Sequence, residues 1–254
     1  MVGLATGMLS GAFGVGGAVI STPGIRILGA SAFEAVGTTL PAIIPSAAVG
    51  TARYAREGLV DWPIVGATAP VGAVTAVAAS YASHAVPGEG HLLMVLTAAI
   101  LGYTAWRMAR NDEASAEDHE DGERATSGDR RSLPGAAGVG AVAGALSGLL
   151  GVGGGVVLVP GFSELLRLPL KTAIATSLAC VGILAVPSTV AHTLLGDIDW
   201  RMALLLAVAV VPGSRLGAVL SIRATDRRLR LAVAGFLGAI AVAYGIGEIS
   251  AALR

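Results

Sequence analysis

Long apolar segments with almost no charge constrain this chain more than any other feature. Leu92–Trp106, Ala203–Val211 and Leu229–Ile246 are interrupted mainly by glycine and alanine. A helix of about 20 apolar residues, rising 1.5 Å per residue, crosses the roughly 30 Å hydrocarbon core of a bilayer. Only 13% of the 254 residues are charged, about half the share found in soluble domains. We therefore expect an all-α, polytopic membrane protein, with the lipid bilayer as its main partner.

The composition also disfavours other classes of protein. A soluble globule with this many apolar segments would have too little polar surface to cover it. A transmembrane β-barrel would alternate polar and apolar residues over about ten positions, whereas these segments are continuously apolar. Cys180 is the only cysteine, and no basic stripe, metal-ligand cluster or nucleophile–base pair stands out. We expect no enzyme activity, no cofactor, no metal and no nucleic-acid partner.

One segment differs sharply from the rest. Residues 111–131, "NDEASAEDHEDGERATSGDRR", contain eight acidic and three basic residues and no large apolar side chain. Such a composition is typical of a solvated linker. It predicts three parts: a first membrane repeat at 1–110, a charged cytoplasmic linker at 111–134, and a second membrane repeat at 135–254.

The two predicted repeats share a glycine-rich phrase. "LSGAFGVGGAVISTPG", residues 9–24, matches "LSGLLGVGGGVVLVPG", residues 146–161, at a shift of 137. The shift then becomes 138. It aligns Thr38–Leu40 with Thr176–Leu178, and Asp61–Trp62 with Asp199–Trp200. A duplication of about 100 residues per copy is typical of transporters.

Each copy contains four hydrophobic segments. They are expected near 3–28, 33–52, 64–85 and 91–108, and near 136–166, 171–195, 201–222 and 229–253. If all eight segments cross the membrane, Lys and Arg divide nine to seven between its two sides. If the first segment of each copy turns back, thirteen lie on one side and only Arg26, Arg201 and Arg254 on the other. Because cytoplasmic loops collect Lys and Arg, we expect two inverted repeats whose first segments are broken or re-entrant.

The glycine phrase suits such a break. Glycines permit a non-helical turn, and Pro23 and Pro160 disfavour a continuous helix. Non-helical backbone at membrane depth is tolerated where it is buried in protein or lines a cavity. The half-helix N-termini at a break attract anions. The candidate substrate-binding glycines are Gly14, Gly16, Gly17, Gly151, Gly153, Gly154 and Gly155. The alternative is that these glycines only allow close helix packing.

At these motifs the chain resembles the sulfite exporter TauE/SafE family. The resemblance rests on "GVGGG…VP" and "GVGGA…TP", and on the Gly-x-x-Asp-Trp after the second segment of each copy. It implies a bacterial inner-membrane carrier for sulfite, sulfonates or other small organic anions. Ala18 stands where the second copy has Gly155, so the two copies need not have equal roles.

Polar residues in apolar surroundings complete the candidate site. Arg215, deep in the seventh segment, is placed to balance an anion's charge, or to extend toward the cytoplasmic side. Thr38, Thr39, Thr176 and Ser177 are placed to bond an oxyanion or a half-helix end, or their own helix backbone. His192 is a candidate proton carrier or an interfacial histidine. Asp61 and Asp199 are expected to cap helices, and Trp62 and Trp200 to anchor at the interface.

The sequence thus predicts a secondary transporter for a small anion, with sulfite or another organosulfur or organic anion as substrate. A coupling proton or ion would supply the energy. An anion channel, or a carrier for an unrelated small solute, remains the alternative.

Overall fold

The computed structural model describes residues 2–17, 29–83, 133–150 and 154–252, together with residues 21, 22, 24, 25, 99, 102, 103 and 106. Residues 111–132 of the predicted linker, Gly151 and Gly153 lie outside this described part. Within it, all regular structure is helical, as expected from the apolar segments. The helices are α1 (Val2–Phe13), α3 (Ala32–Ala55), α4 (Trp62–Ser83), α6 (Leu133–Leu150), α7 (Gly155–Pro160), the π-helix η3 (Gly161–Leu165), α8 (Leu170–Leu195), α9 (Trp200–Arg223) and α10 (Asp226–Ala252).

Four of the described helices, α3, α4, α8 and α9, are long and apolar enough to cross a membrane. Their bounds agree with the second and third segments predicted for each copy. The first segment of each copy, by contrast, is divided. The short helix α1 ends at Phe13, and α6 is followed by the separate elements α7 and η3. The chain is therefore interrupted at both glycine phrases, as the sequence predicts.

Polar residues set the ends of the long helices. Ser31 caps α3 by accepting a hydrogen bond from the Glu34 amide at 3.1 Å. Asp199 caps α9, because its Oδ1 accepts from the amides of Arg201 and Met202 at 2.9 and 3.2 Å. The predicted capping role of Asp199 is confirmed. At the other end of α8, Gly196 has a φ of 79°, a left-handed conformation that suits glycine and ends the helix.

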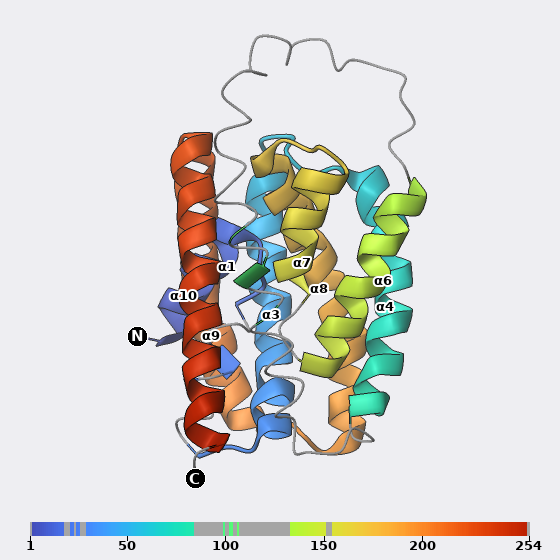
Figure 1. The fold of residues 1–254 in the computed structure, drawn as a ribbon, viewed down its shortest axis with the longest axis vertical. Helices are drawn as coiled ribbons and strands as arrows, with labels where there is room; N and C mark the ends of the chain where they lie inside the picture. The colour runs from blue at the N-terminus through green and yellow to red at the C-terminus, as the bar shows by residue number, and fades with distance from the viewer. Residues whose placement is uncertain are drawn as a thin grey trace.

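The helices α3 and α8 lie side by side at the centre and run in opposite directions (Figure 1). The start of α3 meets the end of α8, where a Cβ on Gly37 would collide with the Asp197 backbone. The start of α8 meets the end of the loop after α3, where Thr176 bonds Asp61. We call the end of the bundle where α4, α8 and α10 begin the upper end, and the end where α3 and α9 begin the lower end, as drawn in Figure 1.

Small residues bring the remaining helices into close contact. Along α1, a Cβ added to Gly7 or Gly11 would collide with the backbone of Val210 or Ser214 in α9. Since contacts advance together along both helices, α1 runs parallel to α9. Small residues at helix interfaces let membrane helices approach in this way.

The same arrangement joins α6 to α4. A Cβ on Gly144 or Gly148 would collide with the backbone of Gly72 or Ala76. In the alignment of the two copies, these glycines are the equivalents of Gly7 and Gly11, and their partners are the equivalents of Val210 and Ser214. The first helix of each half therefore packs on the helix of the third predicted segment of the other half, in the same register.

Candidate functional site

The first helix break follows α1. Gly14, Gly16 and Gly17 have φ angles of 70°, 83° and 73°, in the left-handed region that L side chains rarely adopt. A Cβ on Gly16 would lie 2.5 Å from Cγ1 of Val181 and 3.7 Å from Cγ2 of Ile43. Because Val181 and Ile43 lie near the middle of α8 and α3, the break lies at mid-depth in the bundle. Backbone at this depth must find its hydrogen-bond partners within the protein.

Hydroxyl groups from neighbouring helices supply some of those partners. Tyr54, buried in α3, donates to the carbonyl of Gly11 at 2.8 Å. Ser177, buried in α8, donates to the carbonyl of Gly14 at 2.9 Å. Gly11 lies in the last turn of α1 and Gly14 directly follows the helix, where carbonyls lack helical partners. Of the three partners considered for the Ser177 hydroxyl, the structure thus shows the half-helix end.

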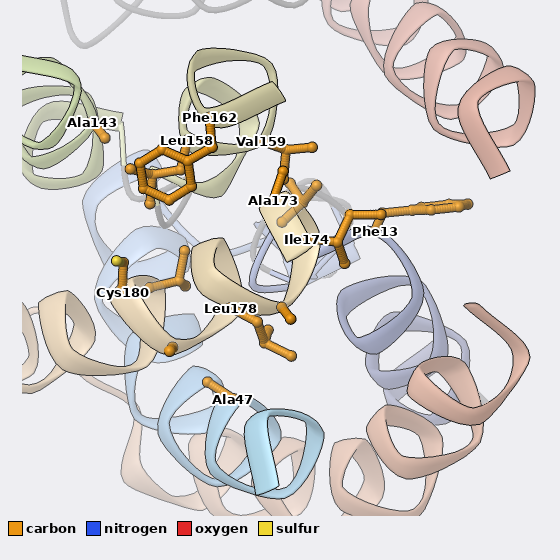
Figure 2. Packing of buried hydrophobic residues seen from close by; sticks show 14 of the residues in the cluster. Phe13, Ala47, Ala143, Leu158, Val159, Phe162, Ala173, Ile174, Leu178 and Cys180 are labelled. Carbon is orange, nitrogen blue, oxygen red and sulfur yellow. The ribbon is translucent and has the colours of Figure 1, made fainter. Parts of the chain in front are cut away.

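The second break is surrounded by apolar side chains. Gly154 has a φ of 66°, and the chain then forms α7 and η3. Leu158, Val159 and Phe162 are fully buried. Figure 2 shows Leu158 and Phe162 next to each other between Ala143 of α6 and the helix α8. These side chains fill the space beside the break.

The two breaks touch each other. A Cβ on Gly155 would lie 2.5 Å from the carbonyl oxygen of Gly14 and 2.7 Å from Cα of Val15. Only a glycine allows this approach. The two glycine phrases, which belong to different halves of the sequence, therefore meet inside the bundle.

A small pocket lies beside the first break. Its volume is about 10 Å³, which is room for about one water molecule. The polar side chains around it come from α1, α3 and the segment after the break. The lining residues are Thr6, Gly16, Gly17, Ser21, Thr39, Ala42, Ile43, Ser46, Leu206 and Val210.

The hydroxyls of this pocket are buried and, with one exception, engaged. Ser21 donates to the carbonyl of Gly17 at 3.1 Å, and Thr39 donates to the carbonyl of Val36 at 2.9 Å. Ser46 donates to the hydroxyl of Ser10 at 3.2 Å. Thr6 Oγ1 is buried and has no hydrogen-bond partner. A buried polar atom without a partner is unfavourable, so the Thr6 hydroxyl has unused capacity for a hydrogen bond or a ligand.

Thr38 and Thr176 make matching contacts at the two ends of the bundle. The Thr38 hydroxyl accepts from the Asp199 amide at 3.0 Å, at the lower end. The Thr176 hydroxyl accepts from the Asp61 amide at 3.0 Å, at the upper end. Each contact ties the start of one central helix to the residue before a long helix of the other half. Neither threonine lines the pocket.

Two titratable candidates lie away from the pocket. Arg215 is exposed on α9, although Ser214 beside it is buried. His192 is buried, and its Nδ1 lies 2.9 Å from Oδ2 of Asp197. Its side chain is packed inside the protein, in the last turn of α8. Among the described buried side chains, none is a lysine or arginine, and the described residues include no cluster of three His, Cys, Asp or Glu.

Sequence reasoning missed the polar side of the pocket, namely Thr6, Ser21 and Ser46. A signal was present in the aligned copies. The equivalents of these three residues in the second copy are Ala143, Leu158 and Leu184. Positions with a hydroxyl in the first copy are therefore apolar in the second copy.

Comparison with known proteins decides the family. The sulfite exporter TauE/SafE family matches residues 1–244. The chain belongs to the TauE/SafE family. It is a multi-pass membrane transporter and not an enzyme.

Curated relatives carry general names. A probable membrane transporter protein of Xylella fastidiosa is 30% identical over 88% of this chain and 82% of its own length. The probable membrane transporter protein YunE of Bacillus subtilis is 26% identical, over 87% and 86%. The archaeal probable membrane transporter protein MJ0441 of Methanocaldococcus jannaschii is 23% identical, over 94% and 91%. No solved structure matches the chain significantly.

Proposed function

We propose that this TauE/SafE protein is a secondary transporter of a small anion, sulfite or another organosulfur or organic anion, across the bacterial cytoplasmic membrane. The observation that carries the proposal is the contact between the two helix breaks, where Gly155 packs on Gly14 and Val15. Many carriers form their substrate site from broken helices that meet at the middle of the membrane. The anion is bound by glycine amides and by the positive ends of the half-helices.

An inverted repeat accounts for this meeting of the breaks. The halves 1–110 and 135–254 are proposed as the two repeats, with 111–134 as the cytoplasmic linker. Their central helices α3 and α8 run in opposite directions. Matching Thr–Asp contacts, made by equivalent residues of the two halves, lie at opposite ends of the bundle. In this arrangement the first segment of each repeat enters the membrane, breaks, and returns to the side from which it came.

The distribution of basic residues supports a cytoplasmic upper end. Arg201 is the described basic residue at the lower end, where α9 begins. At the upper end, Lys171 lies 3.5 Å from Asp226 and donates to the Ile222 carbonyl. The other described basic residues near the upper helix ends and loops are Arg53, Arg56, Arg167, Arg223, Arg227, Arg228 and Arg230. Lys and Arg collect on the cytoplasmic side of membrane proteins.

Arg215 takes the second of its two expected roles in this proposal. It is exposed and does not line the pocket. About two helical turns separate it from Arg223 at the upper end of α9, so its long side chain can extend toward the cytoplasmic headgroups.

Transport of sulfite in proteoliposomes tests the proposal. We expect saturable uptake of labelled sulfite by the wild type, and its loss in Gly16→Leu, because the new side chain collides with Val181 and disturbs the glycine turn. Gly66→Leu is the matched control, since Gly66 is exposed on α4 with no neighbouring atom within 4 Å of a new Cβ. Uptake by the wild type that rises linearly with sulfite, without saturation, would indicate a channel. No uptake of sulfite or of small sulfonates would refute the proposed substrate class.

A further inference from the structure

We propose that the pocket beside the first helix break binds a small monovalent cation of the size of Na⁺. The role of this cation in transport rests on the proposed function, in which it accompanies the anion. The binding itself rests on the pocket alone.

The size of the pocket favours an ion over the transported anion. At about 10 Å³, it has room for about one water molecule, and a bare Na⁺ is no larger than a water molecule. An oxyanion with three oxygens needs more space than one water molecule. The anion is therefore expected at the neighbouring glycine turn, and the cation in the pocket.

The hydrogen bonds of the pocket favour a cation over a hydrogen-bond acceptor. A hydroxyl has one proton to donate and two lone pairs to offer. Ser21, Thr39 and Ser46 give their protons to Gly17 O, Val36 O and Ser10 Oγ. Their oxygens still have lone pairs to offer to a ligand in the pocket. Hard cations prefer such oxygen ligands.

Thr6 provides the independent sign that a ligand belongs here. Its side chain is 2% exposed, it lines the pocket, and Oγ1 has no hydrogen-bond partner. The C-terminal end of α1, with its partial negative charge, lies at the same break. Broken membrane helices commonly bind coupling ions with unwound backbone and helix ends of this kind.

A bound cation would balance the negative charge of the transported anion. None of the described buried side chains is a lysine or arginine. Moving a lone anion through apolar surroundings is unfavourable. A Na⁺ bound beside the glycine turn supplies the positive charge that the described core lacks.

Only the first copy is built for this ion. The positions equivalent to Thr6, Ser21 and Ser46 are Ala143, Leu158 and Leu184. Leu158 and Leu184 are fully buried and offer no oxygen ligand. We therefore expect one ion site in each transporter chain.

Equilibrium binding of radioactive Na⁺ to the full-length protein in lipid nanodiscs tests this proposal, with choline chloride holding the ionic strength constant. We expect saturable binding by the wild type. Thr6→Val and Ser46→Ala each weaken it by about tenfold or more, since each removes one oxygen ligand. Thr6→Ser retains binding. The matched control is Ser147→Ala, which removes a buried hydroxyl without a partner from the second copy and leaves Na⁺ affinity unchanged.

Two results would overturn the site. The first is the absence of saturable Na⁺ binding by the wild type, which would make the pocket a water site. The second is an unchanged Na⁺ affinity in folded Thr6→Val and Ser46→Ala proteins. If Thr6→Val does not fold, the Na⁺ affinity of Ser46→Ala tests the site by itself. Sulfite flux is measured separately, so the two proposals fail in different ways. Na⁺ binding without flux of any anion refutes the proposed transport but not the site, whereas sulfite flux independent of Na⁺ overturns the coupling.

Discussion

The first and second helix breaks share one glycine phrase but differ in what surrounds it. Beside the first break, Ser21 and Ser46 line a small pocket. The equivalent positions beside the second break are Leu158 and Leu184, both fully buried. Phe162 adds further apolar volume there (Figure 2). The same backbone interruption thus borders a small pocket lined by hydroxyl groups in one copy and is packed by apolar side chains in the other.

This difference indicates a division of roles between the copies. Tightly packed apolar side chains keep a non-helical turn in one position. A polar turn needs a partner for its polar groups, so it is suited to binding and release. We infer that the second break supports the first, since Gly155 packs directly on Gly14 and Val15. The ligand then contacts mainly the first copy.

The largest expected effect comes from making the first copy resemble the second. Ser46→Leu places the second copy's side chain in the pocket and fills its volume. We expect sulfite uptake in proteoliposomes to fall to the background of empty liposomes, while the protein still inserts and folds. Retained uptake in a folded Ser46→Leu protein would show that the two breaks do not differ in function.

The reverse exchange should affect stability and not transport. Leu184→Ser removes buried apolar volume beside α4, where Leu184 would contact a Cβ on Gly72. Large-to-small core substitutions cost about 2–5 kcal/mol, and the new hydroxyl adds a polar group among apolar neighbours. We expect the free energy of unfolding in detergent to fall by about that amount, with uptake per folded molecule close to that of the wild type. A new Na⁺ dependence, or a loss of uptake per folded molecule, would place ligand contacts in the second copy as well.

Close approach between the breaks predicts a smaller effect. Gly155→Ala directs a methyl group at the backbone of Gly14 and Val15. Backbone cannot yield as a flexible side chain does, so overpacking of about 1–3 kcal/mol is expected. Denaturant titration measures the loss. Gly138→Ala in α6 is the control, because a Cβ there has no neighbour within 4 Å, and equal losses in both variants would contradict the contact.

The sequence was sufficient to predict features that depend on local pattern. Apolar length predicted α3, α4, α8 and α9, and the glycine phrases predicted both interruptions. These features follow from residues near each other in the chain. The capping role of Asp199 is equally local, since its partners are the next amides along the chain.

Features that depend on distant neighbours were not predictable in the same way. The surroundings of Thr6 are set by α3 and α9, whose packing follows from three-dimensional contacts between small residues. His192 was weighed as an interfacial residue because of its place near a loop. Its burial depends on how that loop folds back onto the helix, where Asp197 meets its ring.

The smallest expected effect concerns the two Thr–Asp contacts at opposite ends of the bundle. Thr176→Val and Thr38→Val each remove one hydrogen bond, worth about 0.5–1.5 kcal/mol. Thr176 lies four residues before the buried Cys180 in α8. We expect Thr176→Val to speed alkylation of Cys180 by a maleimide by roughly two- to tenfold, because a weaker upper contact opens more often.

Thr38→Val is the matched variant, since it loosens the lower end instead and should leave labelling of Cys180 from the upper side close to that of the wild type. The reagent is added to oriented membrane vesicles from one side at a time. Equal acceleration by both variants would mean that they loosen the whole bundle. Acceleration by Thr176→Val alone would show that the two ends open independently, as a carrier with one binding region and two alternating exits requires.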